Sequence, residues 1–251
     1  MKTKFTILLC CILFIASAYA QETNNVSDSI ATTEKSSVTY DGASYSVVFA
    51  WKKKQAYEPH WTGFGMAFIG FSDLEGADLA RGSSYSFTFN PIDYYIPIYR
   101  NWLFVTGAGI DWSRYHFKGD IGLADIGTTV DFEPAPDGIH YRSSKLLAYY
   151  ITIPLLIEYQ KKISKKQSFY ISGGAVGYIK CYSKSQVEYS DTKKQVNLGR
   201  DLNILPVNAR FMLQVGIEDV SAFAYYSPFS IIENGKGPEL RPYGIGMRLN
   251  F

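Results

Sequence analysis

The chain has few cysteines, no long hydrophobic run and almost no net charge, and each of these absences excludes a class of protein. Three cysteines in 251 residues are too few for a disulfide framework. No stretch reaches the roughly 18 apolar residues that a transmembrane helix needs. The 25 basic and 23 acidic residues nearly cancel, which argues against a nucleic-acid-binding protein, because such proteins carry a basic patch.

The first twenty residues have the order of a secretory signal peptide. Lys2 and Lys4 precede an apolar run from Phe5 to Ile15, and Ala18-Tyr19-Ala20 supplies the small residues of a cleavage site. We therefore predict a signal peptide over residues 1–20 and an exported mature protein. Without the two leader lysines, 23 basic residues would face 23 acidic ones, so the mature chain would carry no formal net charge.

Cleavage at that site would also decide the cysteine chemistry. It would remove Cys10 and Cys11 and leave Cys181 as the single cysteine. No intramolecular disulfide could then form, so we expect the exported fold to be held together by its own sheet.

The last nine residues, Tyr243 to Phe251, show a pattern that recurs along the chain. The odd positions are Tyr, Ile, Met, Leu and Phe, and the even positions are Gly, Gly, Arg and Asn. Successive side chains of a strand point to opposite faces, so this segment has one apolar face and one small or polar face. The pattern is typical of the closing strand of a transmembrane β-barrel, in which a terminal Phe can lie in the interfacial aromatic girdle.

Seven further segments alternate in a similar way, and we find no helical period. The eight predicted strands are 61–71, 84–98, 102–117, 147–160, 169–180, 207–217, 220–226 and 243–251. Pro91 shifts the phase of the second segment and predicts a β-bulge there. An even number of short strands suits the smallest membrane barrels. We therefore predict an all-β fold, an eight-stranded antiparallel up-and-down transmembrane β-barrel.

The connections between these segments alternate strictly in length. Three are short, at 99–101, 161–166 and 218–219, and four are long, at 72–83, 118–146, 181–205 and 227–242. Outer-membrane barrels have short periplasmic turns and longer extracellular loops. We therefore expect both termini of the barrel to lie on the periplasmic side and the long loops to face outward. Residues 132–138 contain two prolines and a glycine, which predicts irregular loop structure.

The predicted organisation has three parts: the signal peptide over 1–20, a periplasmic leader over 21–59 and an outer-membrane β-barrel over 60–251. The leader is polar, and its sequence leaves three alternatives open: a disordered segment, a small plug, or an extra strand around residues 45–51.

Four short motifs stand in and between the predicted strands: His60-Trp61-Thr62-Gly63-Phe64, Leu103 to Gly109 (LFVTGAG), Thr152 to Leu156 before Glu158, and Lys236 to Leu240 (KGPEL). They resemble Bacteroidetes outer-membrane β-barrel proteins of the broad PorT-like class. The resemblance covers about 60–251 and implies the fold and the outer membrane. It implies no activity, because the class carries no catalytic motif that could be mapped onto this chain.

Charged residues on the predicted inner face are the first candidates for a site: Asp111, Glu158, Lys180, Arg210, Glu218 and Arg248. The interior of an eight-stranded barrel is narrow enough to be filled by side chains. Isolated charges would be costly there, so we expect acids and bases to pair and to occlude the interior. The alternative is a conducting path.

Other reactive side chains form no recognisable motif. His60, His116 and His140 lack the spacing of metal ligands. Asp137, Ser143 and Ser144 lie near His140, but neighbours in a loop are not a catalytic triad. We therefore predict no catalytic, cofactor-binding or metal-binding residues.

Two glycine-rich or basic segments also have ordinary explanations. Gly173, Gly174 and Gly177 lack the Lys-Ser/Thr and the helix of a phosphate loop. Four lysines in 161–166 fit a solvated turn better than a site for anionic lipid headgroups, which basic turns can also hold.

From these observations we predict a non-enzymatic, monomeric protein of the cell outer membrane that presents extracellular loops for binding or envelope interaction. Its expected surroundings are outer-membrane lipid and an extracellular or envelope protein partner, without nucleic acid. One alternative is a small pore or a transport or secretion accessory. A weaker alternative is a barrel enzyme that modifies lipid or peptide.

Overall fold

A computed structural model describes residues 35–40, 43–48, 58–72, 74, 76–80, 82–163 and 167–251. The predicted signal peptide and most of the leader lie outside these residues. Within the leader, β1 (Lys35–Tyr40) pairs antiparallel with β2 (Ala43–Val48). The extra strand expected around residues 45–51 therefore coincides in part with β2.

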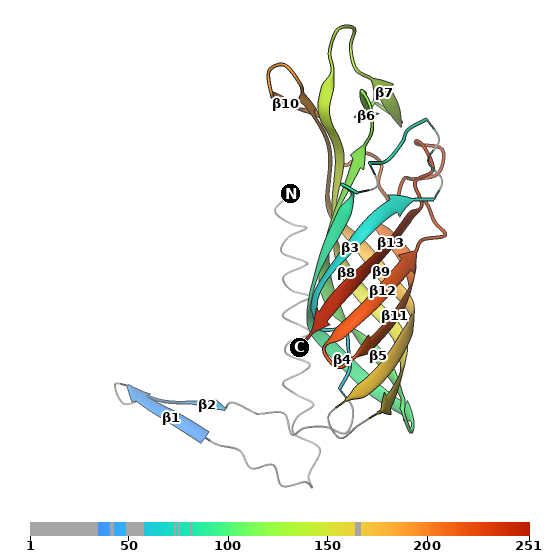
Figure 1. Ribbon diagram of the computed structural model, residues 1–251. Helices are drawn as coiled ribbons and strands as arrows, with labels where there is room; N and C mark the ends of the chain where they lie inside the picture. Colours follow the sequence, from blue (N-terminus) through green and yellow to red (C-terminus); the bar gives the residue numbers. More distant parts are fainter. Residues whose placement is uncertain are drawn as a thin grey trace. The chain divides into compact units, whose positions relative to one another are not determined.

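All described elements of residues 58–251 are β-strands (Figure 1). They are β3 (Gly63–Phe71), β4 (Tyr85–Tyr99), β5 (Trp102–Phe117), β6 (Ile121–Asp125), β7 (Val130–Pro134), β8 (Tyr141–Lys162), β9 (Ser168–Tyr189), β10 (Gln195–Arg200), β11 (Val207–Ile217), β12 (Val220–Tyr226) and β13 (Pro242–Asn250). The described residues contain no helix that is long and apolar enough to cross a membrane.

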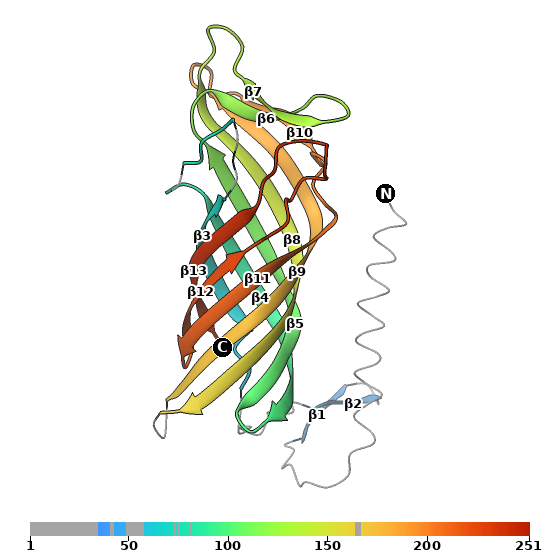
Figure 2. The same cartoon turned by 90° about the vertical axis from the view of Figure 1, so that its right-hand side faces the viewer.

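Eight of these strands close into a ring. Each strand of the series β3, β4, β5, β8, β9, β11, β12 and β13 pairs antiparallel with the next, and β13 pairs back onto β3. The strands run obliquely around the ring, and β6, β7 and β10 lie beyond one of its ends in both ribbon views (Figure 2). We call this the loop end, and the opposite end, where the short connections lie, the turn end.

Side chains of the ring alternate between its interior and its exterior as predicted. On β11, Phe211, Leu213 and Val215 are 59%, 53% and 38% exposed, whereas Met212 and Gln214 are 7% and 1% exposed. Glycines on the inner face leave room for large rings from neighbouring strands. A Cβ at Gly216 would overlap the Tyr170 ring, and one at Gly244 would overlap the Tyr225 ring.

Two β-bulges adjust the alternation. The register between β4 and β5 shifts between Phe89 and Ile92, which confirms the bulge predicted at Pro91. On β9, Cys181 is passed over, because Tyr149 of β8 pairs with Tyr182 and Tyr150 pairs with Lys180. One extra residue reverses the faces of the rest of the strand.

The fourth and fifth predicted strands, β8 and β9, extend into segments that were expected to be loops. β8 starts six residues before the predicted 147, and β9 continues past 180 to Tyr189. The loop 118–146 also contains the hairpin β6–β7, so the expectation of irregular structure at 132–138 is wrong up to Pro134. The loop 181–205 contains β10, which pairs with β9.

The loop end has an apolar cap of its own, which continues the core of the ring. Its fully buried side chains come from β6, β7 and the last two long loops: Leu123, Val130, Leu202, Ile204, Ile231, Ile232 and Leu240. Backbone hydrogen bonds join the loops, from Val130 N to Lys236 O at 2.8 Å and from Leu205 N to Ile231 O at 2.7 Å. The long loops therefore fold together over one end of the ring.

Candidate functional site

Four of the six charged residues predicted on the inner face are buried inside the ring. Asp111, Glu158, Arg210 and Arg248 are each at most 2% exposed. Lys180 pairs with the buried Tyr150 and so also lies on the inner face, toward the loop end, where its ammonium group bonds to Asp201 and to Ile204 O. The placement of Glu218 is wrong. Glu218 lies in the β11–β12 turn at a positive φ of 51° and accepts a hydrogen bond from Ser168 N.

Arg210 is at the centre of an aromatic cluster. Its guanidinium carbon lies 3.7 Å from the centroid of the Tyr178 ring and 5.0 Å from that of Tyr225. Asp111 attracts it electrostatically, while Oδ1 of this carboxylate accepts a hydrogen bond from Ser113 at 2.5 Å. None of the guanidinium nitrogens makes a hydrogen bond to the described residues. Arg210 is therefore held by rings and by charge rather than by a direct ion pair.

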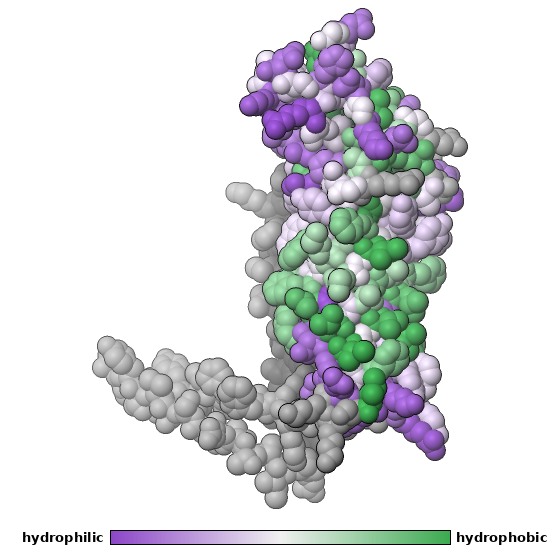
Figure 3. Space-filling model, in the orientation of Figure 1, coloured by the Kyte–Doolittle hydropathy of each residue, from purple (hydrophilic) through white to green (hydrophobic). Residues whose placement is uncertain are grey.

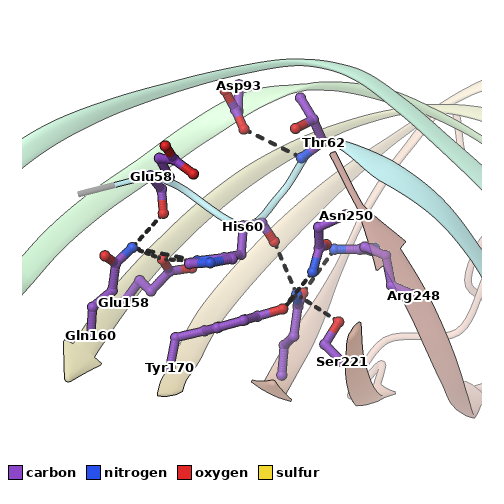
Figure 4. A network of polar contacts seen from close by, with 11 residues as sticks. Glu58, His60, Thr62, Asp93, Glu158, Gln160, Tyr170, Ser221, Arg248 and Asn250 are labelled. Carbon is purple, nitrogen blue, oxygen red and sulfur yellow. Dashed lines mark hydrogen bonds and ion pairs between the residues drawn. The ribbon is translucent and has the colours of Figure 1, made fainter. Parts of the chain in front are cut away.

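At the turn end, residues Glu58–Thr62 enter the ring just before β3. We call these five residues the plug segment. His60 Nδ1 bonds to the Glu158 carboxylate at 2.8 Å, and its ring stacks on Tyr170 with centroids 3.6 Å apart (Figure 4). Gln160 Nε2 donates to Glu158 Oε1 at 2.6 Å and to Glu58 O at 2.5 Å. Polar side chains of β8 and β9 therefore anchor the segment.

The opposite wall of the ring holds the same segment. Gln214 Nε2 donates to His60 O at 2.9 Å, and Gln214 Oε1 accepts from Arg248 at 2.8 Å. The Arg248 guanidinium lies 4.4 Å from the Trp61 ring, which is 2% exposed. Asn90 Nδ2 donates to Trp61 O at 3.1 Å. Contacts to several strands thus fix the plug segment across the interior at the turn end.

The three histidines lie in three different places, as the sequence predicts. His60 is in the plug segment. His116 is near the loop end of β5, and its backbone N–H donates to the Ser84 hydroxyl oxygen at 2.9 Å. His140 precedes β8, and its Nδ1 bonds to Asp120 Oδ2 at 2.7 Å. This exposed contact raises the pKa of His140 and lowers that of Asp120, chiefly through the hydrogen bond between them.

The residues near His140 do not assemble a nucleophilic site. Its imidazole bonds to Asp120 and not to Asp137. Ser144 is buried on the inner face, and its hydroxyl has no hydrogen-bond partner in the described structure. Across the described residues, no group of three or more His, Cys, Asp or Glu side chains could hold a metal ion.

The glycine segment is part of a strand: Gly173, Gly174 and Gly177 lie within β9, not in a phosphate loop. Of the four lysines in 161–166, Lys161 and Lys162 are exposed at the end of β8, and Lys165 and Lys166 lie outside the described residues.

Sequence reasoning missed the uncharged part of the polar interior. Tyr170, Gln214 and Trp61 are central to the plug contacts, but none carries a charge that would single it out. The available signal was the position of Tyr170 and Gln214 on the predicted inner face and of Trp61 at the start of the first predicted strand.

No protein-family model matches the chain, and the comparison with curated proteins finds no match either.

Proposed function

We propose that this chain is an eight-stranded β-barrel of the outer membrane, resembling the PorT-like class, that acts as a closed scaffold and binds an envelope or extracellular partner through its loop end. It performs no catalysis in this proposal. The observation that carries the membrane part is the exterior of the ring, and the observation that carries the binding part is the folded loop end.

The exterior of the ring has a broad apolar surface with polar residues beyond it. In Figure 3 hydrophobic residues gather over the middle of the visible face and hydrophilic ones at both ends. Ile245, Met247 and Leu249 of β13 are each more than 60% exposed. Large contiguous apolar patches are rare on monomeric soluble proteins. Lipid contact would account for this surface.

Two rows of aromatic side chains bound the apolar surface, one across β4, β5, β8 and β9 and the other across β4, β5 and β8. Directly paired residues form the row nearer the loop end: Phe87, Trp112, Tyr149 and Tyr182. Tyr99, Trp102 and Tyr159 form the row nearer the turn end. Aromatic girdles at both interfaces are characteristic of membrane barrels.

The separation of the two rows fits a bilayer. Tyr149 and Tyr159 are ten residues apart on β8. At about 3.3 Å per residue and a strand tilt of about 45°, this distance spans roughly 23 Å along the membrane normal. The apolar band of outer-membrane barrels is about 25 Å tall.

Closure of both ends favours a scaffold over the alternative of a pore. The plug segment crosses the interior at the turn end, and the apolar cap covers the loop end. Between them, Arg210 and its tyrosines fill the middle. Planar-bilayer recordings of the purified protein should therefore show no steady conductance, and stable open channels would favour the pore.

The loop end suits binding because it is ordered before a partner arrives. Loops on a rigid scaffold are where binding residues concentrate, and a preorganised surface loses less entropy on association. Ile126 and Phe229 are 50% and 56% exposed there, outside the apolar surface of the ring. Exposed apolar side chains of this kind can serve as anchors for a partner.

Two experiments test the proposal in sequence. Carbonate extraction of cell envelopes should leave the protein in the outer-membrane fraction, and recovery in the soluble periplasm would refute the membrane part. Quantitative co-purification in detergent should then lose the same specific partner from Ile126→Ser/Phe229→Ser. Ile163→Ser, an equally apolar and exposed change at the turn end, is the matched control and should retain it.

A further inference from the structure

The exterior of the ring carries a second feature beside the aromatic row of the loop end. Strand pairing places Tyr85, Arg114, Leu147, Lys184 and Arg200 in one row across β4, β5, β8, β9 and β10. Directly paired residues of antiparallel strands share a face. Arg114 and Lys184 follow Trp112 and Tyr182 by two residues, so the row lies on the outer face, one step beyond the aromatic row.

A further row continues the same surface. His116, Lys145, Gln186 and Asn197 pair across β5, β8, β9 and β10. The two rows together contain four permanent cations, and none of their members is acidic. We call Arg114, Lys145, Lys184 and Arg200 the basic patch.

The members of the basic patch lie close to one another. Neighbouring strands are about 4.8 Å apart and alternate residues of one strand about 6.6 Å, so all four side chains come from one small area. His116 lies beside these positive charges: burial lowers its pKa, and the charges of Arg114 and Lys145 lower it further.

Two nearby acids are engaged elsewhere. Glu188, in the next row toward the loop tips, pairs with Arg142 at 3.1 Å. Asp201 pairs with Lys180. Arg114 donates one hydrogen bond to the Tyr85 hydroxyl at 3.0 Å, and its guanidinium has further N–H groups. The patch therefore has positive charge that acidic side chains of the described residues do not neutralise.

We propose that the basic patch binds the phosphate groups of a phosphorylated glycolipid in the outer leaflet. This inference rests on the proposed membrane insertion, because the aromatic row sets the depth of the patch. Tyr and Trp lie at the headgroup level of a bilayer, and Arg and Lys one step farther out meet the phosphates, which they bind through charge-assisted hydrogen bonds. A protein partner is the less favoured occupant, because the patch lies directly beside the lipid-facing surface.

The site is confined to one side of the barrel. The basic patch belongs to β5, β8, β9 and β10, whereas the loop ends of β12 and β13 carry the paired Tyr226 and Tyr243, and Arg241, just before β13, pairs with Glu239. Bound glycolipid would therefore order one flank of the barrel and leave the opposite flank free.

Native mass spectrometry of the full-length protein in a non-ionic detergent tests the proposal. The probes are diphosphoryl lipid A and, as a zwitterionic reference, phosphatidylcholine. The wild type should retain lipid A preferentially. Removal of each cation should weaken this binding about fivefold, so Lys145→Gln/Lys184→Gln should bind about 25-fold more weakly and the variant with all four replaced by Gln should lose the preference.

The matched control is Lys161→Gln/Lys162→Gln, which removes two cations at the turn end and should bind lipid A like the wild type. Equal loss in this control, or unchanged binding in the patch variants, would overturn the patch. Flotation of every variant with phosphatidylcholine vesicles is read separately. Failure of the wild type to float would refute membrane insertion itself, whereas flotation of all variants with no lipid A preference would refute the glycolipid site alone.

Discussion

The inner and outer faces of the ring use the same strands with opposite chemistry. On β11, Gln214 points inward and is 1% exposed, while its neighbour Leu213 points outward and is 53% exposed. Soluble proteins place most such residues the other way round. The comparison teaches that polarity here follows the face of the strand rather than its exposure to solvent, so each face should respond differently to the same substitution.

The inner face itself contains two kinds of polar burial. Around the plug segment, hydrogen bonds join Glu158 to His60 and to Gln160, and Gln214 to the backbone carbonyl of His60. Around Arg210, rings and electrostatic attraction take the place of hydrogen bonds. Loss of a buried charge should therefore cost more in the middle of the ring than loss of one hydrogen bond at its turn end.

The largest effect is expected for Arg210→Gln on the inner face. The change leaves Asp111 buried without the cation that attracts it, and an uncompensated buried charge costs about 3 to 5 kcal/mol. Urea-dependent unfolding in vesicles measures it. The double variant Asp111→Asn/Arg210→Gln should recover part of the loss, and strictly additive effects would show that the two charges are not coupled.

On the outer face, Leu213→Arg should destabilise the protein by about 2 to 4 kcal/mol if this position contacts lipid near the bilayer centre. The same change on a water-exposed strand would stay within about 0.5 kcal/mol, which makes it the sharpest test of the comparison. Asn197→Arg on β10, exposed at the loop end, is the control and should have no measurable effect.

A smaller effect is expected for His60→Phe in the plug segment. Phe keeps an aromatic ring against Tyr170 but cannot bond to Glu158, and a buried acceptor that loses a partner costs about 1 to 3 kcal/mol. The same unfolding assay measures it. Thr62→Val, which removes a more exposed bond from Thr62 Oγ1 to Phe251 O, should cost less, and the reverse order would contradict the assigned role of the plug segment.

The periodicity of the sequence predicted the ring strands well, because a strand with one apolar and one polar face alternates between apolar and polar residues. Where a bulge reverses that period, the prediction stopped too early. Cys181 reverses β9, so the continuing strand looked like the start of a loop. The hairpin β6–β7 was missed because its burial comes from the apolar cap, a long-range assembly of several loops that no local pattern announces.

The alternation of faces predicted which residues lie inside the ring, but it did not predict which residues they contact. Parity placed Arg210 and Arg248 inside, but pairing of unlike charges suggested acids as their partners, whereas Tyr178 and Trp61 lie against them. Glu218 was misplaced because it lies in the turn after β11, where the alternation no longer decides where a long side chain goes.

The smallest effect belongs to the loop end, outside both faces of the ring, where His140 and Asp120 form an exposed pair. The hydrogen bond with Asp120 raises the pKa of His140, and the bond with His140 lowers the pKa of Asp120. The histidine contribution is therefore complete below its ordinary pKa of about 6.5 and disappears as the pH rises through the raised value. The aspartate contribution disappears as the pH falls through the lowered pKa of Asp120, so the pair is strongest between these limits.

An NMR titration of the His140 ring should show its pKa falling toward the ordinary value in Asp120→Asn, while Asp137→Asn, a change at the carboxylate that His140 does not contact, should leave it unchanged. The unfolding transition of the ring should move in neither variant, and a shift of that transition with the His140 titration would mean that the loop end and the ring unfold as one unit.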